Sequence, residues 1–179
     1  IAVLADNTDP ALLLEEPKLM PALKEAARER TQASEEEEIR GELRARAAFT
    51  LGVIGGPEAM DELAILTEDG YPNARFNAAI GLARNGDERA GPVLVEMLDP
   101  EADSVHAGEE DKTAIAWKRA LVMINALESV ERLAKANPDA ELRDVKAAVK
   151  KLEAAELDPL IAGRVHTEAR EVSARLKDR

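Results

Sequence analysis

Two stretches of this chain are nearly the same sequence, and this internal repeat constrains the fold more than any other feature. RARAAFTLGVIGG occupies residues 44–56 and RFNAAIGLARNGD occupies residues 75–87, one copy 31 residues after the other. The copies share an Arg, two Ala, a Leu and a Gly at the same offsets. A fixed period of this length is typical of repeat proteins, in which each repeat is one supersecondary unit.

Each copy predicts a pair of short antiparallel helices joined by a tight turn. The first helix of the first copy ends at residues 55–56, both Gly, and Pro57 opens the next helix. The first helix of the second copy ends at residues 85–86, Asn-Gly, and Pro92 lies near the first turn of the next helix. The apolar residues that recur at helical spacing are Ala47, Leu51, Ile54, Ala59, Leu63, Leu66, Ala78, Leu82, Ala90, Leu94 and Met97.

The composition supports an all-helical fold. Aromatic residues make up only 2% of the 179 residues, so the core must be filled by Ala, Leu, Val and Ile. The chain is rich in strong helix formers, and no alternating apolar pattern predicts a strand. One helix pair cannot bury its apolar faces alone, so neighbouring pairs must stack. We therefore predict an all-α fold, a right-handed α–α superhelix of about four to five helix pairs.

The second copy resembles a known repeat family. The pattern D-x-x-x-x-x-R-x-x-A-A-x-x-L-x-x-x-G, which begins at Asp69, is similar to the HEAT repeat. More narrowly, it resembles the HEAT-like repeats of phycobilisome lyases, as does GGPEAMDELAILTEDG at residues 55–70. The clear resemblance covers about residues 41–99. It implies a HEAT-type solenoid in which the second helices of the units line the concave side.

The flanks of these repeats are expected to belong to the same single domain. Residues 1–40 are predicted to form N-terminal helices, one of which starts at Asp9-Pro10, and residues 41–99 form the two clear repeats. Residues 99–111 have one large aliphatic side chain, Val105, and are predicted to form a structureless, mobile acidic loop. A dedicated binding element is the alternative interpretation of this loop.

The C-terminal part is predicted to contain a third repeat and a cap. Residues 111–136 are interpreted as a degenerate repeat of two helices, TAIAWKRALVMINAL and SVERLAKAN. Residues 137–179 are interpreted as a capping helix pair with a polar outer face. Its helices are expected to start at Asn137-Pro138 and Asp158-Pro159, where a capping side chain precedes Pro at the first helical position.

Acidic residues are concentrated in the middle of the chain. The net charge is −12, and residues 58–111 alone hold 14 acidic and 3 basic residues, a net charge of −11. Such a surface repels phosphates, so nucleic acid is not an expected partner. We predict an acidic ridge on the concave surface that attracts a basic segment of a partner protein. The predicted ridge residues are Asp61, Glu62, Glu68, Glu96 and Asp99.

The resemblance also implies a structural role for three charged residues. Arg44 and Arg75 are equivalent by the 31-residue shift, and Asp69 precedes Arg75 as in the family pattern. In HEAT proteins such residues join adjacent repeats through charge-assisted hydrogen bonds. Glu38 stands six residues before Arg44, where the pattern has Asp. Because of this departure, we expect the series of hydrogen bonds between adjacent repeats to begin only at the second unit.

No motif in the sequence predicts catalysis. The chain has no cysteine, and neither His106 nor His166 is placed to pair with a serine in a nucleophilic triad. We interpret His106 as a solvated loop residue and His166 as a surface or packing residue. Neither is followed by Glu, whereas the resemblance to the HEAT-repeat enzyme deoxyhypusine hydroxylase would require His-Glu dipeptides as iron ligands. No metal site and no cofactor are predicted.

Two further features are interpreted structurally. EEEE at residues 35–38 places negative charge at the start of a helix, where the dipole favours it. A cation site or a basic-peptide site is the alternative for this run. Trp117 is interpreted as core or seam filler rather than as a platform on which a planar ligand stacks.

The sequence therefore predicts a non-enzymatic scaffold for protein–protein interaction. One alternative is a lyase-type enzyme or accessory that acts on a tetrapyrrole-bearing or otherwise modified protein. Another is a structural segment of a larger protein, because the sequence begins at Ile1 rather than Met. No apolar run approaches the ~20 residues that span a bilayer, so no membrane insertion is predicted. The compartment is left open, since an N-terminal signal would precede Ile1.

Overall fold

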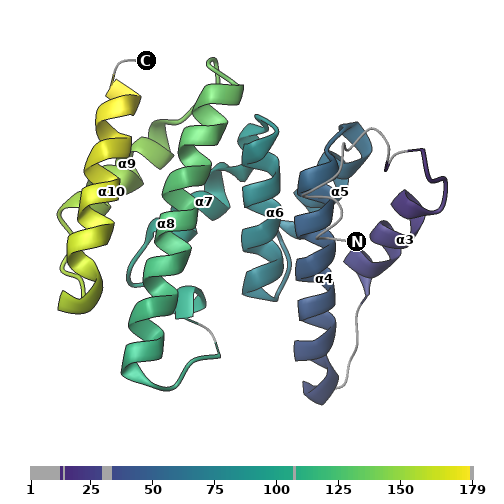
Figure 1. Cartoon of the computed structure of the whole chain (residues 1–179), viewed down its shortest axis with the longest axis horizontal. Coiled ribbons are helices and arrows are strands. Elements are labelled where there is room, and N and C mark those ends of the chain that lie inside the picture. Colours follow the sequence, from purple (N-terminus) through teal and green to yellow (C-terminus); the bar gives the residue numbers. More distant parts are fainter. Residues whose placement is uncertain (1–12, 14, 30–33, 107, 178–179) are drawn as a thin grey trace.

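The structure is a computed structural model that describes residues 13, 15–29, 34–106 and 108–177 (Figure 1). This part of the chain is helical and contains no strand, which confirms the predicted all-α fold. The predicted start of a helix at Asp9-Pro10 lies outside the described residues. The α-helices are α3 (Leu19–Arg28), α4 (Ser34–Ile54), α5 (Pro57–Leu66), α6 (Pro72–Arg84), α7 (Gly91–Leu98), α8 (Lys112–Ala136), α9 (Arg143–Glu153) and α10 (Pro159–Lys177), and the 3-10 helices are η1 (Glu88–Ala90) and η2 (Asp103–His106).

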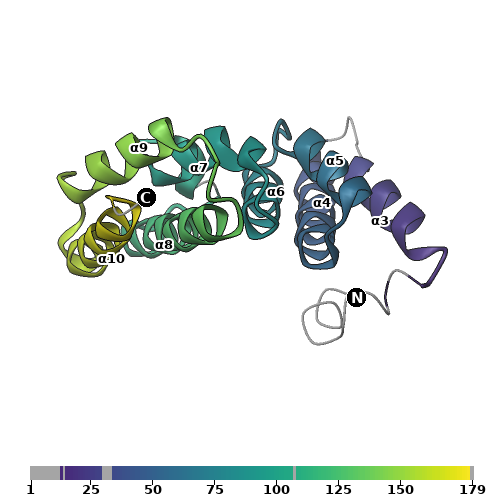
Figure 2. The same ribbon diagram turned by 90° about the horizontal axis from the view of Figure 1, so that it is seen from above.

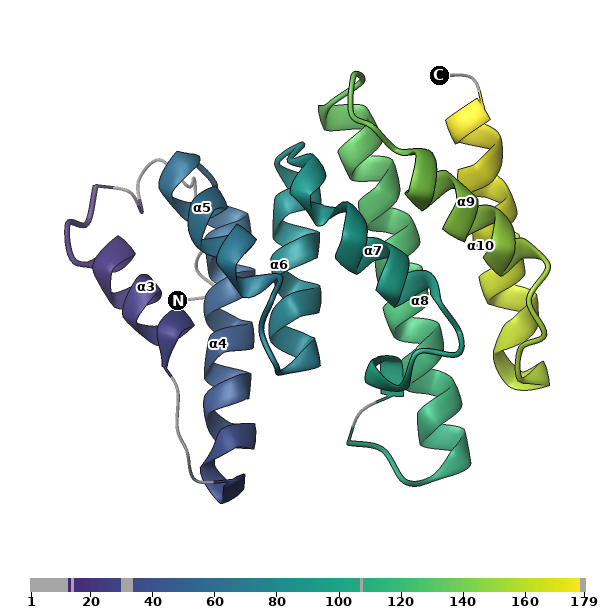
Figure 3. The ribbon, with the colours of Figure 1, turned by 180° about the vertical axis from the view of Figure 1, so that it is seen from behind.

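The helices lie in two layers. Figure 2 shows α4, α6, α8 and α10 in one layer, which we call the first layer, and α5, α7 and α9 in the second. First-layer helices follow one another side by side, and each contacts the next (Figure 1). The second-layer helices cross them on the other face, where α3 contacts α4 and α5 (Figure 3). The chain therefore forms a stack of hairpins, as the repeat predicts.

The two repeated segments are neighbouring parallel helices. The side-chain amide of Asn77 donates to the Ala45 carbonyl oxygen at 2.9 Å, and that of Asn85 donates to the Gly52 carbonyl oxygen at 2.9 Å. From the first contact to the second, the residue numbers rise along both α4 and α6, so the two helices run in the same direction. A Cβ atom built on Gly81 would lie 2.8 Å from the Gly52 Cα atom, so the backbones touch where both residues lack a side chain. This glycine pair sets the close spacing of α4 and α6.

The predicted turns have the expected chemistry. Gly55 and Gly56 have φ angles of 73° and 85°, a left-handed conformation in which a side chain would be strained. Gly86 has a φ angle of 77° and follows α6. Pro57 is the first residue of α5. The left-handed glycines therefore end α4 and α6 and reverse the chain into the second layer.

The third repeat is divided differently from the prediction. Residues 112–136 form one continuous helix, α8, so the predicted helix break before Ser129 was wrong. No Gly or Pro interrupts this stretch, and the Ser129 hydroxyl donates to the Asn125 carbonyl oxygen at 2.7 Å within the helix. The second-layer partner of this unit is α9, and α10 closes the first layer. The described residues thus hold three complete helix pairs, flanked by α3 and α10.

The two predicted helix starts in the C-terminal part have different outcomes. Asp158 accepts a hydrogen bond from the Leu160 backbone N–H at 2.9 Å, and α10 starts at Pro159 as predicted. The predicted start at Asn137-Pro138 was wrong, because α9 starts only at Arg143. Asn137 instead donates from its side chain to the Gly86 carbonyl oxygen at 3.1 Å. It holds the end of α8 against the end of α6 rather than capping α9.

The acidic connection between α7 and α8 has more structure than predicted. It contains the 3-10 helix η2, and the Val105 side chain is fully buried in the common core. The Ser104 hydroxyl donates to Glu96 at 2.6 Å. Val105, the one large aliphatic residue of this stretch, therefore anchors it, and the expectation of a structureless loop was wrong. Its mobility stays a prediction.

Candidate protein-binding surface

Glu62 of the predicted ridge is an internal residue. Its side chain is only 2% exposed, because α3 packs beside α5. Arg28 of α3 donates to it from Nε to Oε1 at 2.8 Å and from Nη2 to Oε2 at 2.6 Å. The prediction that Glu62 is exposed was therefore wrong. Glu62 joins α3 to α5 and cannot meet a partner.

Glu96 of the predicted ridge is partly buried, with its side chain 28% exposed. It accepts hydrogen bonds from the Arg75 Nη2 atom at 2.6 Å and from the Ser104 hydroxyl at 2.6 Å. Burial would raise the pKa of Glu96, but the bonds from Arg75 and Ser104 outweigh burial and leave the pKa below its ordinary value. Glu96 therefore connects α6, α7 and η2, and its charge is engaged by Arg75 and Ser104.

The other three predicted ridge residues lie at the surface. The Asp61 side chain is 78% exposed and forms a 3.4 Å ion pair with Arg89. Glu68 is exposed near the end of α5. Asp99 is half-buried and forms a 3.3 Å ion pair with Lys151 of α9. The predicted ridge thus separates into residues that hold helices together and residues that face solvent.

The three residues with an implied structural role are close together in space. Arg44 donates two hydrogen bonds to the Asp69 carboxylate, at 2.8 and 2.9 Å, and a third to Glu37 at 2.5 Å. Arg75 makes different contacts. It donates to the Asp69 carbonyl oxygen at 2.7 Å and to Glu96. Arg44 and Asp69 join α4 to the α5–α6 turn, and Arg75 joins that turn to α7.

A groove lies between α7 and α9 on the second-layer face. Two adjoining cavities of about 530 and 260 Å³ share Val95 and Asp144 as lining residues, and we call them together the α7–α9 groove. Apart from Val95, Leu98 and Val145, its apolar floor consists of small or compact residues. These are Gly91, Pro92, Ala147 and Ala148. A main chain can approach such a floor closely.

Carboxylates outnumber cations along this groove. The acidic lining residues are Glu88, Asp99, Glu141 and Asp144, and the basic ones are Arg143 and Lys151. Lys151 pairs with Asp99, and the Arg143 guanidinium lies 3.9 Å from Glu141. Asp144 has no ion-pair partner among the described residues. The groove therefore carries an excess of negative charge that the protein itself leaves unbalanced.

The sequence analysis did not predict this groove, although Asp99 of the predicted ridge is one of the residues that line it. The prediction divided residues 111–136 into two helices. It therefore paired α7 with the wrong second-layer neighbour, whereas the structure has α9 beside α7. The sequence feature that could have predicted the groove is the set of small residues Gly91, Ala147 and Ala148. Small side chains on two facing helices leave a shallow channel between the helices. The correct pairing would have placed these residues opposite one another.

The histidines and Trp117 form no recognisable catalytic arrangement. The His106 ring lies 3.9 Å from the Asp103 carboxylate, and His166 contacts the Ala155 carbonyl oxygen at 3.0 Å through Nε2. Trp117 is half exposed, so it does not fill the core, whereas its interpretation as seam filler stays a prediction. No group of three or more His, Cys, Asp or Glu side chains within the described part of the chain is arranged to hold a metal ion. None of the helices in that part is both long and apolar enough to cross a membrane.

Comparison with known families supports the repeat assignment. Residues 26–110, which run from α3 to the segment before α8, match the family model of HEAT repeats. The match confirms the resemblance to HEAT repeats, whereas the narrower likeness to the phycobilisome-lyase type stays a prediction. No curated protein and no solved structure matches the chain. HEAT repeats are generally scaffolds for protein interaction.

Proposed function

We propose that this chain, which carries HEAT repeats over residues 26–110, is a scaffold that binds a basic segment of a partner protein in the α7–α9 groove. The observation that carries this proposal is the excess of carboxylates on both sides of a groove with a small-residue floor. Glu88 and Asp99 stand on the side of α7, and Glu141 and Asp144 stand on the side of α9.

The shape of the groove favours an extended segment with long basic side chains. Gly91, Ala147 and Ala148 leave room for a partner's main chain. Lys or Arg side chains that leave this main chain on alternate sides can reach carboxylates on both sides of the groove. Asp144 supports the proposal most strongly, because no cation of the described residues neutralises it.

The remaining exposed ridge residues have a supporting role in this proposal. Asp61 lies on the second-layer helix α5 and Glu68 in the turn that follows it, away from the groove lining. Their charges add to the negative potential that draws a basic segment towards the second layer. Such long-range attraction is screened by salt, with a Debye length of about 8 Å at physiological ionic strength.

The test uses a labelled peptide of alternating Lys and Ala residues and fluorescence anisotropy. We expect the peptide to bind, with a Kd that rises about tenfold between low and moderately high salt. Asp144→Lys should raise the Kd about tenfold, and Ala147→Leu should raise it by filling the floor. The control is Asp103→Lys, which reverses a fully exposed carboxylate outside the groove. Equal effects of Asp144→Lys and Asp103→Lys, or equal binding of a Glu-Ala peptide, would contradict the proposal.

A further inference from the structure

The N-terminal half of α4 extends beyond its first-layer neighbour. The Tyr71 ring, immediately before α6, packs against Gly41, where an added Cβ atom would lie 2.4 Å from the ring. α4 itself begins at Ser34, seven residues before Gly41 (Figures 1 and 3). The first turns of α4 therefore have no neighbouring helix in the direction of α6.

Two large apolar side chains are exposed on this part of α4. Ile39 is 73% exposed and Leu43 is 43% exposed. They are four residues apart, so they lie one above the other on the same face of the helix. Ile39 is the most exposed large aliphatic residue of the described chain. Water-exposed apolar surface of this kind marks an interaction site when it is contiguous and rimmed by polar groups.

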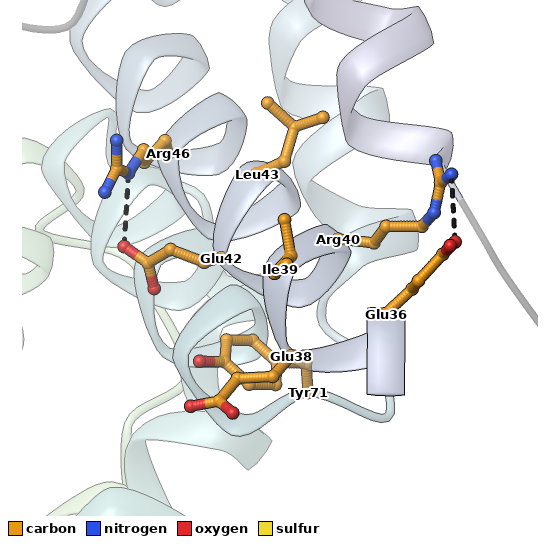
Figure 4. A pocket seen from close by; sticks show the side chains of 8 residues that line it. All are labelled: Glu36, Glu38, Ile39, Arg40, Glu42, Leu43, Arg46 and Tyr71. Carbon is orange, nitrogen blue, oxygen red and sulfur yellow. Dashed lines mark hydrogen bonds and ion pairs between the residues drawn. The ribbon is translucent and has the colours of Figure 1, made fainter. Parts of the chain in front are cut away.

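A cavity of about 830 Å³ surrounds these two side chains, and we call it the α4 groove (Figure 4). Ile39 and Leu43 occupy its centre, and Tyr71 lies at one end beside Glu38. Charged side chains on both sides frame the apolar centre. These are Glu36 and Arg40 on one side and Glu42 and Arg46 on the other.

Some of the charged side chains around this groove are paired within the chain, and one is not. Arg46 pairs with Glu42 at 3.2 Å, and Arg40 pairs with Glu36 at 3.3 Å and also with Glu29. Both cations of the groove are thus engaged within the chain. Glu38 has no ion-pair partner in the described part of the chain, and it points into the same opening as Tyr71 (Figure 4).

The Tyr71 hydroxyl is influenced both by burial and by the charges around it. Burial raises the pKa of the Tyr71 hydroxyl, and the nearby carboxylates Glu42 and Glu38 raise it further. Hydrogen bonding to Asn73 and the charge of Arg44 lower the pKa, but not enough to offset these effects. Glu38 and Glu42 thus place carboxylates beside the apolar surface of Ile39 and Leu43. A cationic group from outside is the natural complement of this combination.

We infer that the α4 groove docks an amphipathic helix of a partner protein, with two apolar side chains one turn apart and Lys or Arg beside them. A helix laid along α4 repeats its side chains at the same spacing as Ile39 and Leu43, so apolar residues of both helices can interdigitate. Its basic residues would then face Glu38 and the carboxylates of the rim. The groove runs from Glu36 to Arg46, about 15 Å of helix at 1.5 Å per residue.

A second copy of this chain is a poor occupant of this groove. In a symmetric dimer the same patch packs on itself. The two arginines of the patch already pair with Glu36 and Glu42, so a second copy brings no uncommitted cation to Glu38. A basic partner supplies such a cation. The charge of the rim therefore selects a different protein over self-association.

This groove is independent of the α7–α9 groove. It lies on a first-layer helix, whereas the α7–α9 groove lies between second-layer helices (Figure 2). It also selects for apolar anchors, which the α7–α9 groove does not require. The two grooves can hold two segments at the same time, so the chain can bridge two partners or two parts of one partner.

The experiment uses a labelled Leu/Lys peptide, designed as an amphipathic helix of about 14 residues, long enough to cover the groove. We expect it to bind the whole chain in a fluorescence anisotropy titration. The double variant Ile39→Ser with Leu43→Ser should weaken binding at least about tenfold, because both apolar contacts are lost. Glu38→Lys should weaken it by several-fold and should reduce its dependence on salt.

Matched controls separate this groove from general stickiness. Ile65→Ser removes a side chain of similar exposure, 55%, from α5, and Asp61→Lys reverses an exposed charge on the same second-layer helix. Both should bind the Leu/Lys peptide like the unmodified chain. An excess of the Lys-Ala peptide should not displace it, so failure of one groove is distinguishable from failure of the other. Thermal unfolding curves establish that each variant is folded.

Three results would overturn the inference. The first is no binding of the Leu/Lys peptide, or equal binding of a Leu/Glu peptide. The second is equal weakening by Ile65→Ser and by the double variant. The third is a dimer in sedimentation velocity that the double variant abolishes, because a second copy would then be the occupant.

Discussion

Arg44 and Asp69 form a bidentate ion pair in the interior of the array. The Arg44 Nε and Nη2 atoms lie 2.8 and 2.9 Å from the two Asp69 carboxylate oxygens, and both side chains are almost fully buried. Asp69 also accepts a hydrogen bond from the Tyr71 backbone N–H at 2.8 Å. One carboxylate thus connects α4 with the turn that starts the next repeat.

Removing Asp69 should destabilise the whole array. Asp69→Ala leaves the buried Arg44 charge without its main partner, which costs about 3–5 kcal/mol in comparable sites. Urea unfolding measures this loss. The control is Asp61→Ala, which removes an exposed ion pair with Arg89 and should cost about 1 kcal/mol or less. A similar small loss for both variants would mean that the buried pair is not a principal contact between repeats.

The close contact between Gly52 and Gly81 should reverse the usual effect of alanine in a helix. Gly81→Ala places a Cβ atom 2.8 Å from the Gly52 Cα atom and 2.9 Å from a Leu63 methyl group. We expect a loss of about 1–3 kcal/mol in unfolding free energy, because α4 and α6 must move apart. Gly163→Ala in α10 meets no atom within 4 Å and should stabilise the chain by about 0.5–1 kcal/mol. The same sign for both variants would contradict the tight α4–α6 packing.

Glu96 should make stability depend on pH in the acid range. Its pKa is lowered in the folded chain from an ordinary value of 4.5, so its contribution is complete above about pH 4.5. This contribution is lost as the pH falls through the lowered folded-state pKa. Unmodified protein should therefore lose more unfolding free energy than Glu96→Gln between pH 6 and strongly acid pH. A stability difference between the two proteins that is independent of pH would show that Arg75 and Ser104 do not favour the charged carboxylate.

Much of the fold could be predicted from local sequence. The repeated segments and their glycine turns specify α4 to α7, because the backbone conformation at Gly55, Gly56 and Gly86 is itself a local property. The division of residues 112–136 could not be predicted in the same way. Ser129 can either end a helix or bond back to its own helix, and tertiary packing decides between these.

The binding surface was harder to predict, because the exposure of a charge depends on distant parts of the chain. Glu62 and Asp61 are adjacent in sequence, yet one is buried by Arg28 of α3 and the other faces solvent. Local periodicity places both on α5 but does not reveal α3 beside it. The α4 groove depends likewise on where α6 begins. From the sequence, a basic-peptide site at residues 35–38 was only the alternative interpretation.

The proposed function depends on a division of second-layer acids into those that join helices and those that meet a partner. The most direct test is to compare Glu62→Lys and Asp144→Lys by thermal unfolding and by anisotropy with the Lys-Ala peptide at low temperature. Glu62→Lys places two cations together at a buried site, so its Tm should fall by more than about 5 °C, while the folded protein still binds. Asp144→Lys should keep its Tm and bind about ten times more weakly. A stable Glu62→Lys that loses the peptide, or an unstable Asp144→Lys that retains it, would contradict the proposed function.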